Sequence, residues 1–322
     1  MYSGQAGIDY LATKVGQEDS RASSHWKKYH SAFRFLGKEG FEGLHGFGGS
    51  GKPYKGLRRV MTSWLQRRFR KMGGSKFKGI DRLAEEMVAR EHSADDLDVL
   101  RQALTVSFLK EQIPDLFTSV STSCVIGDGF GSLTSLMLAS DFSDRVVLVN
   151  LTKTLLVDLW FLQLWFGLEA FESQVDLVTD EVGLLRALAK PATNEFNKKR
   201  VIAIQASDHQ LLRQCPVDIV LNIASMQEMD LSVITTYFDD MRVIASRRKL
   251  FFYCCNREEK ILPDGAVIRF SEYPWCTSDQ VIVDELCPWH QQYYTAMPPF
   301  FRSYDGLHRH RLVTFNKIIK GV

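Results

Sequence analysis

The chain has 322 residues, of which 45% are hydrophobic and 24% charged, and its formal net charge is +2 at pH 7. This length suffices for one large domain, or for a domain of about 200 residues with an appendage, and the apolar content suffices for a sizeable core. No apolar run reaches the roughly 18 residues of a membrane span, so no transmembrane segment is expected.

The N-terminal segment and the cysteines indicate the compartment. The chain does not begin with a basic region followed by an apolar one, so no secretion signal is visible. The six cysteines form no C-x-x-C pair, and several lie inside apolar, strand-like runs. We therefore expect reduced, buried thiols in a cytoplasmic protein.

Residues 1–120 are more polar than the rest and carry helical patterns, which predicts a helical N-terminal extension or lid. A glycine-rich stretch, residues 43–53, interrupts them. Residues 46–52 formally match a phosphate loop, but no strand precedes them and Pro53 stands where Ser or Thr is needed. A flexible lid or connecting loop is the favoured interpretation.

Two helical patterns follow the glycine-rich stretch. Residues 55–78 contain nine lysines and arginines and no acid, and Val60, Trp64 and Phe69 recur there at helical spacing, which predicts an amphipathic basic helix. Residues 81–103 form the second pattern, with leucines and a methionine as the expected buried positions.

From residue 121 onward, strand and helix patterns alternate, which predicts an α/β fold with a Rossmann-like sheet of seven strands over residues 121–322. The early strands are continuous apolar runs, as expected for strands covered on both faces. The clearest helices are residues 152–171 and 231–244, with Asp230 as a candidate N-cap. The predicted strands are residues 123–126, 145–149, 200–205, 218–223, 249–255, 280–285 and 311–315.

A glycine-rich turn follows the first of these strands. Gly127, Gly129 and Gly131 are spaced G-x-G-x-G between a strand and a helix, where α/β enzymes hold nucleotide-like cofactors. The dinucleotide fingerprint fails because Ser132 replaces its third glycine. The spacing, with Asp128 between the first two glycines, is typical of class I methyltransferases that bind S-adenosylmethionine. A plain strand-to-helix turn is the alternative.

Polar residues at the ends of the next strands extend this candidate cofactor site. Asn150 ends the second strand, about 20 residues after the glycines, where an acidic residue usually binds the ribose hydroxyls. Asp208, after the third strand, is the candidate partner of the adenine amine, or else caps the following helix. The predicted cofactor-binding residues are Gly127, Asp128, Gly129, Gly131, Asn150, Leu151, Asp208 and Asn222.

The acceptor is expected beside the end of the fourth strand, residues 222–230. Methyl transfer to a hydroxyl needs an aligned acceptor and removal of its proton. The candidate bases are Glu228, His290 and His308, although Glu228 could also serve only to cap a helix. The aromatic segment 289–304 could line an acceptor pocket or pack in the core. The predicted substrate-binding residues are Gln227, Asn256, Arg257 and Tyr293.

The sequence does not decide whether the protein binds a metal ion. Asp284 and Glu285, together with Glu228, offer the hard oxygen ligands that Mg²⁺ prefers. Neighbouring side chains on a strand point to opposite faces, which weakens the case, so no metal ligands are assigned.

With these motifs in hand, the chain resembles a bacterial family of sugar O-methyltransferases. The resemblance implies a class I methyltransferase sheet with a helical N-terminal extension, S-adenosylmethionine as cofactor, and hydroxyls of polysaccharides, glycolipids or related glycosides as acceptors. The chain departs from the family where Asn150 stands in place of Asp before Leu151. The motifs that carry the resemblance are residues 24–26 with Tyr29, 46–48, 124–131, 222–229 and 256–257.

Other functions compete with this interpretation. The basic segment 55–78 fits an RNA methyltransferase, although no RNA-binding module is visible and no stable nucleic-acid complex is expected. A natural-product methyltransferase and a non-catalytic scaffold are further alternatives. The expected partner is a sugar-containing acceptor, and a homo-oligomer is compatible with the sequence.

Overall fold

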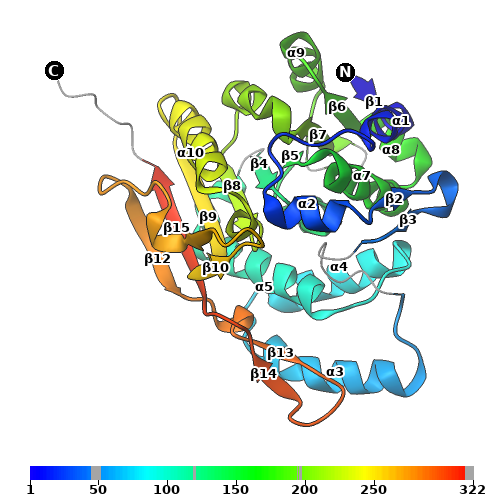
Figure 1. Ribbon diagram of the computed structural model, residues 1–322, viewed down its shortest axis with the longest axis vertical. Helices are drawn as coiled ribbons and strands as arrows, with labels where there is room; N and C mark the ends of the chain where they lie inside the picture. The colour runs from blue at the N-terminus through cyan, green and yellow to red at the C-terminus, as the bar shows by residue number, and fades with distance from the viewer. Residues whose placement is uncertain (45–51, 119–120, 194, 196–197, 316–322) are drawn as a thin grey trace.

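A large mixed sheet forms the centre of the molecule (Figure 1). The computed structural model describes residues 1–44, 52–118, 121–193, 195 and 198–315. Within these residues the sheet has nine strands in the order β1-β6-β7-β5-β4-β8-β9-β15-β12. From β6 to β9 in this order, each strand pairs parallel with the next. β1 pairs antiparallel with β6, and β15 pairs antiparallel with β9 and β12. The strands are β1 (Tyr2–Ser3), β4 (Thr122–Ile126), β5 (Arg145–Asn150), β6 (Val175–Val178), β7 (Arg200–Gln205), β8 (Ile219–Ile223), β9 (Leu250–Arg257), β12 (Gln280–Leu286) and β15 (His308–Phe315).

The α/β prediction is confirmed, and each of the seven predicted strands has its counterpart in β4, β5, β7, β8, β9, β12 or β15. The predicted helix 152–171 is two helices, α7 (Thr152–Phe166) and α8 (Leu168–Gln174). Gly167 separates them because its backbone has a φ of 77°, a conformation that favours glycine and ends a helix. The chain then enters β6, a strand that the sequence did not predict.

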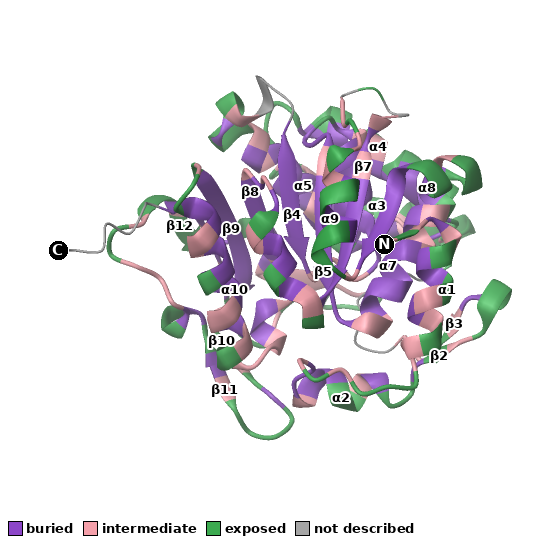
Figure 2. Cartoon of the chain, turned by 90° about the horizontal axis from the view of Figure 1, so that it is seen from above, coloured by how far each residue is buried: buried purple, intermediate pink, exposed green. Residues whose placement is uncertain are grey.

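Helices cover both faces of the sheet. One face packs against α6 (Ser132–Ala139) and α7, with α4 (Phe77–Arg90) and α5 (Leu97–Gln112) beside them. The other face packs against α9 (Glu181–Ala189) and α10 (Leu231–Ala245). Figure 2 shows the strands buried between partly exposed helices. Among the described residues no helix has the length and apolar character needed to cross a bilayer.

The N-terminal helices contact the sheet layers directly. β1 adds an edge strand beside β6, and α1 (Gln5–Lys14) packs against α7. The predicted helical pattern 81–103 is divided between α4 and α5. The division occurs where His92 has a φ of 53° and where the Asp96 carboxylate accepts the backbone N–H groups of Asp98 and Val99, which caps α5.

The basic segment forms α3 (Gly56–Arg70), which packs against the hairpin of β13 (Gln292–Tyr294) and β14 (Phe301–Ser303) at one end of the molecule (Figure 1). Phe69 is buried against Tyr294 and Phe301, whereas Val60 and Trp64 are exposed. Of the glycine-rich stretch 43–53, residues 45–51 lie outside the described residues.

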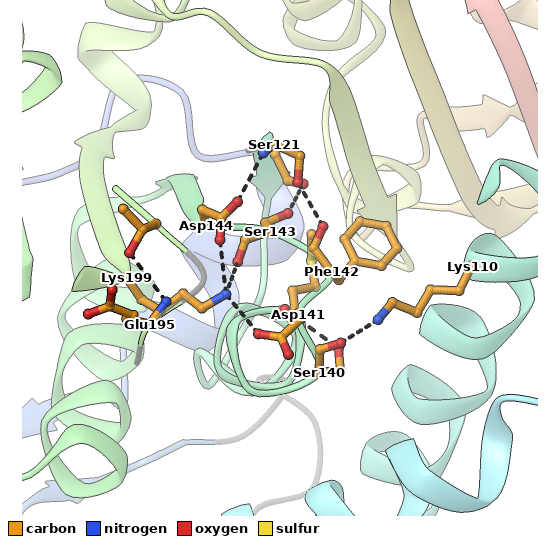
Figure 3. A network of polar contacts seen from close by, with 12 residues as sticks. Lys110, Ser121, Ser140, Asp141, Phe142, Ser143, Asp144, Glu195 and Lys199 are labelled. Atoms are coloured by element: carbon orange, nitrogen blue, oxygen red, sulfur yellow. Dashed lines mark hydrogen bonds and ion pairs between the residues drawn. The ribbon is translucent and has the colours of Figure 1, made fainter. Parts of the chain in front are cut away.

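A polar network holds the amino ends of the central strands together (Figure 3). The ammonium of Lys199, before β7, lies 3.0 Å from a carboxylate oxygen of Asp141 and 3.2 Å from one of Asp144, before β5. The other carboxylate oxygen of Asp144 accepts the backbone N–H of Ser121, before β4. Lys199 is only 1% exposed, so these partners compensate a buried charge. These structural contacts occupy the amino edge of the sheet, so we look for a functional site at the opposite, carboxyl edge.

Remaining short elements are α2 (Ser24–His30), the pairs β2 (Arg34–Phe35) with β3 (Phe41–Glu42) and β10 (Glu259–Ile261) with β11 (Val267–Arg269), and the 3₁₀ helices η1 (Gly37–Glu39), η2 (Pro114–Thr118), η4 (Ala206–Gln214), η5 (Met226–Glu228), η6 (Phe270–Glu272) and η7 (Pro288–His290).

Candidate functional site

The sheet order places a crevice at the carboxyl end of β4. The chain passes from β4 to β5 on one side and later returns to β8 on the other, and ligands of open α/β sheets bind where the order reverses in this way. A cavity of about 220 Å³ lies there. Its described walls come from the ends of β4, β5, β7 and β8, from η5, α5 and α10, and from Arg21, Trp26 and His290.

The glycine turn forms one wall of the cavity. Gly127, Gly129 and Gly131 have φ values of 75°, 101° and 64°. A Cβ atom on Gly127 would lie 2.0 Å from the hydroxyl of Ser225, so this position has no room for a side chain. Gly127 and Gly129 line the cavity, whereas the N–H of Gly131 points to the buried Asp158 at 3.0 Å.

Asp128 lines the cavity but also caps a helix. Its carboxylate accepts the backbone N–H groups of Leu133 at 3.0 Å and Thr134 at 2.7 Å. The acid therefore stabilises the first turn of α6 and holds the glycine turn against it.

The end of β5 contributes Asn150 and Leu151, and both line the cavity. Asn150 donates its side-chain N–H to Asp158 at 2.8 Å, and its amide oxygen accepts the N–H of Leu151 at 2.9 Å. Asp158 is fully buried, and burial raises the pKa of its carboxyl well above the ordinary value, with Asp128 adding to the rise. Asn150 retains one N–H and one oxygen lone pair for a ligand.

The end of β7 meets the cavity through Ala206 rather than Asp208. Asp208 lies in η4 at a non-helical φ of −103°, partly exposed and outside the described cavity lining. Gln205 donates to the hydroxyl of Thr152 at 2.8 Å, which ties β7 to the start of α7.

A buried amide network supports the loop after β8. The Asn222 amide donates to the carbonyl of Ile126 at 2.8 Å, and its oxygen accepts from Asn256 at 2.8 Å. Asn256 in turn accepts the N–H of Gln227 at 3.0 Å, and the Gln227 oxygen accepts the N–H of Arg257 at 2.7 Å. Asn222 and Asn256 are fully buried. These two asparagines thus hold the loop in place, while Gln227 reaches the cavity.

Glu228 lines the cavity and is held from two sides. One carboxylate oxygen lies 2.7 Å from the ammonium of Lys260 and 3.4 Å from Nε2 of His25. The hydroxyl of Ser23 donates to the carbonyl of Glu228, so the start of α2 is fastened to the η5 loop. The side chain of Asp230 precedes α10 without making a capping hydrogen bond.

Of the histidines predicted as bases, the structure brings His290 to the cavity. Burial lowers the pKa of His290 well below its ordinary value, and burial also lowers that of His308, to about 3, so both rings are neutral at neutral pH. His308 lies behind His290, with ring centroids 5.4 Å apart, and is outside the described lining.

Two predicted substrate-binding residues also lie outside the described lining. Tyr293 packs its ring on Tyr304, with centroids 5.1 Å apart, in the hairpin next to α3. Arg257 contributes its backbone to the amide network, and its side chain does not line the cavity.

Sequence patterns missed several residues of the cavity, Arg101 above all. It is 3% exposed and donates to the carbonyl of Trp289 at 3.0 Å, that of Gln292 at 2.8 Å and the hydroxyl of Tyr304 at 2.7 Å. An arginine on the apolar face of the pattern 81–103 was the available signal. Other lining residues that were missed are Arg21, Trp26, Gln102 and Tyr237.

The acids considered for Mg²⁺ are not gathered. Asp284 pairs with Arg309 at 3.0 Å and Arg311 at 2.6 Å, and Glu285 lies 3.4 Å from His310. Neither acid belongs to the described cavity lining that contains Glu228. The charge of Asp284 is compensated by the two arginines of β15 instead.

Comparisons with known proteins give distant likenesses only. No protein-family model and no curated protein matches the chain. A proposed RNA methyltransferase from Pyrococcus horikoshii is 11% identical, with 68% of this chain and 84% of that one covered at a TM-score of 0.39. A glycopeptide N-methyltransferase complexed with S-adenosyl-L-methionine is 12% identical, with 67% and 73% covered at 0.28. A mitomycin 7-O-methyltransferase is 14% identical, with 95% and 93% covered at 0.32.

Proposed function

We propose that the chain is an S-adenosylmethionine-dependent O-methyltransferase that acts on a hydroxyl of a sugar-containing acceptor. One observation carries the proposal: the glycine turn and the Gln227–Glu228 pair line the same cavity at the point where the strand order reverses. The turn that would bind the cofactor and the group that would accept a proton thus line one cavity. The resemblance to sugar O-methyltransferases supplies the acceptor class.

The residues present fit an adenosyl cofactor. Gly127 lines the cavity, and a Cβ there would displace Ser225, another lining residue, so glycine preserves the shape of this wall. Asn150 keeps a donor and an acceptor for a ribose diol, and Leu151 and Ala206 add apolar surface beside it. When bound, S-adenosylmethionine supplies a methyl group activated on a sulfonium.

The acceptor side of the cavity combines polar and aromatic groups. Glu228 accepts the proton that the acceptor hydroxyl loses, and the Gln227 amide offers a hydrogen bond to a neighbouring hydroxyl. Trp26 and Tyr237 provide flat apolar surface, which suits the C–H face of a sugar ring. Both kinds of contact are needed because a sugar ring has apolar faces and a polar rim.

Calorimetry with S-adenosylmethionine tests the cofactor first. We expect binding at a single site, and binding that is undetectable at millimolar ligand contradicts the proposal. The acceptor is then sought by mass spectrometry of surface glycans from a strain without this protein, in which a methyl group should be missing. If the glycan profile is unchanged while the purified protein binds S-adenosylmethionine, the sugar acceptor is rejected and the cofactor assignment stands.

RNA is the second candidate acceptor, because α3 exposes a dense basic surface. Arg58, Arg59, Arg67 and Arg68 lie on this helix, whose apolar side packs on the β13–β14 hairpin. Contacts from such side chains to phosphates make affinity fall steeply with salt. RNA binding that weakens steeply between 50 and 200 mM salt, roughly 10³-fold or more, would favour this candidate. Undetectable binding at low salt removes it.

A further inference from the structure

We propose that Cys255, Cys287 and His290 form a binding site for Zn²⁺ at the wall of the cavity. The two sulfur atoms and a ring nitrogen of the histidine all lie within 4.8 Å of one another. Cys255 and Cys287 are fully buried, and His290 is 5% exposed. Within the part of the chain that the structure describes, no other group of histidine, cysteine and acidic side chains is placed in this way.

The local backbone is suited to metal-ligating cysteine. Cys287 and His290 are spaced C-x-x-H across the short helix η7, and Pro288 begins that helix. The backbone N–H groups of Trp289 and His290 both point to the Cys287 sulfur. Cys255 comes from the carboxyl end of β9, and its thiol is hydrogen-bonded to that of Cys287.

His290 supplies the second, independent observation. Its Nε2 atom is buried and has no hydrogen-bond partner among the described residues. A buried polar atom without a partner is costly, so it calls for a partner such as an ion, a water or a ligand.

The donor set selects the metal. Two thiolates and an imidazole match zinc, whereas Mg²⁺ and Ca²⁺ take oxygen ligands. Tetrahedral bonds of about 2.3 Å to sulfur and about 2.0 Å to nitrogen require donor atoms roughly 3.5–3.8 Å apart. The observed group, within 4.8 Å, reaches that spacing by small side-chain shifts.

The place of the site suggests its role. Three protein ligands leave a fourth zinc position, as in catalytic rather than structural zinc sites. His290 also lines the cavity, so a cation bound to it would lie at the cavity wall. A cation there would bind an acceptor oxygen and favour loss of its proton. This role rests on the proposed function, whereas the metal site itself does not.

The chain contains a matched control for the site. Cys254 is as buried as Cys255 and is its neighbour on β9, yet the two belong to the hydrophobic cores on opposite faces of the sheet. Cys254→Ser therefore removes a buried thiol from the same strand without touching the proposed ligands.

The test uses the full-length protein, reduced and stripped of metal, titrated with Zn²⁺ against a chromophoric chelator and separately with Co²⁺. We expect one Zn²⁺ per chain and a sulfur-to-cobalt charge-transfer band. Cys255→Ser and Cys287→Ser should each weaken binding on the order of 100-fold or more and remove the band, with Cys254→Ser like wild type. His290→Gln should shift the cobalt spectrum.

Circular dichroism checks that each variant is folded, and the wild-type titration stands whether or not a variant folds. Absence of Zn²⁺ binding by the reduced wild-type protein, or equal binding by folded Cys255→Ser, overturns the proposal. Zinc binding without any methyl transfer would leave the site intact and reject the proposed function. Methyl transfer by protein that binds no zinc would support the proposed function and reject the zinc site.

Discussion

Asn150 donates its side-chain amide to Asp158 at 2.8 Å, so the residue expected to hold the cofactor ribose is tied to a buried carboxyl of α7. Asp158 also accepts the N–H of Gly131 at 3.0 Å. One carboxyl therefore links the end of β5 to the glycine turn after β4. This arrangement gives a physical reason for the asparagine, since an acid at the same position would face Asp158.

Asn150→Asp is expected to weaken the protein rather than improve the site. Two carboxyl groups would share a hydrogen-bond distance in a buried place, which costs about 1–3 kcal/mol of unfolding free energy near neutral pH. Asp158→Asn added to that variant should restore most of the loss, because an amide would again face a single carboxyl group. Urea denaturation of both variants measures this. Equal stability of the single and double variants would contradict the expected coupling.

Gly127→Ala is expected to abolish cofactor binding. The new Cβ would lie 2.0 Å from the Ser225 hydroxyl and would project at the cavity wall. Gly167→Ala is the matched control, because Gly167 has a similar φ of 77° against 75° and no atom within 4 Å of a new Cβ. Both variants should lose about 1 kcal/mol or more from backbone strain, and Gly127→Ala should lose more stability because Ser225 must also shift. Calorimetry should show loss of S-adenosylmethionine affinity for Gly127→Ala alone. Equal affinities of the two variants would argue against cofactor binding at the glycine turn.

The sequence predicted the strands whose burial produces a strong hydrophobic pattern. Strands β4 and β5 are covered on both faces, so they are continuous apolar runs in the sequence. β1 has only two residues, and β6 only four behind the break at Gly167, so neither offers enough pattern to recognise. Short strands depend on pairing with their neighbours in the sheet, which a single segment of sequence does not reveal.

Site prediction was limited by pairing between distant segments. Asn222 and Asn256 stand at strand ends, where polar side chains suggest ligand contacts, yet they bond to each other at 2.8 Å. Arg101 was missed because its partners, Trp289 and Tyr304, lie 188 and 203 residues further along the chain. Sequence order shows which polar groups reach the carboxyl edge, and only the fold shows which of them are already satisfied.

Glu228→Gln is expected to lower kcat by roughly 10²–10⁴ while leaving the affinity for S-adenosylmethionine unchanged, if Glu228 accepts the acceptor proton. The amide keeps the shape of the side chain but not its basicity. Glu259→Gln is the control, because Glu259 is exposed on β10 and pairs with Arg269. The measurement is steady-state kinetics once an acceptor is known. Near wild-type kcat for Glu228→Gln would show that Glu228 is not the base.

Glu91 should make stability depend on pH. It is 3% exposed at the end of α4, and burial raises the pKa of its carboxyl to about 8, with Asp128 adding to the rise and Ser93 opposing it. The folded state thus holds a proton that the unfolded chain releases near pH 4.5, so this group's contribution to stability falls as pH rises from about 4.5 to 8.

Glu91→Gln removes that dependence because its amide does not ionise. Relative to wild type, the variant should gain stability as pH rises from 5 to 8, on the order of a few kcal/mol at the upper end. Glu86→Gln, at an exposed site on the same helix, should show no such trend. Urea denaturation at several pH values measures both differences. A Glu91→Gln difference that stays constant with pH would mean that this carboxyl is already ionised in the folded protein at pH 5.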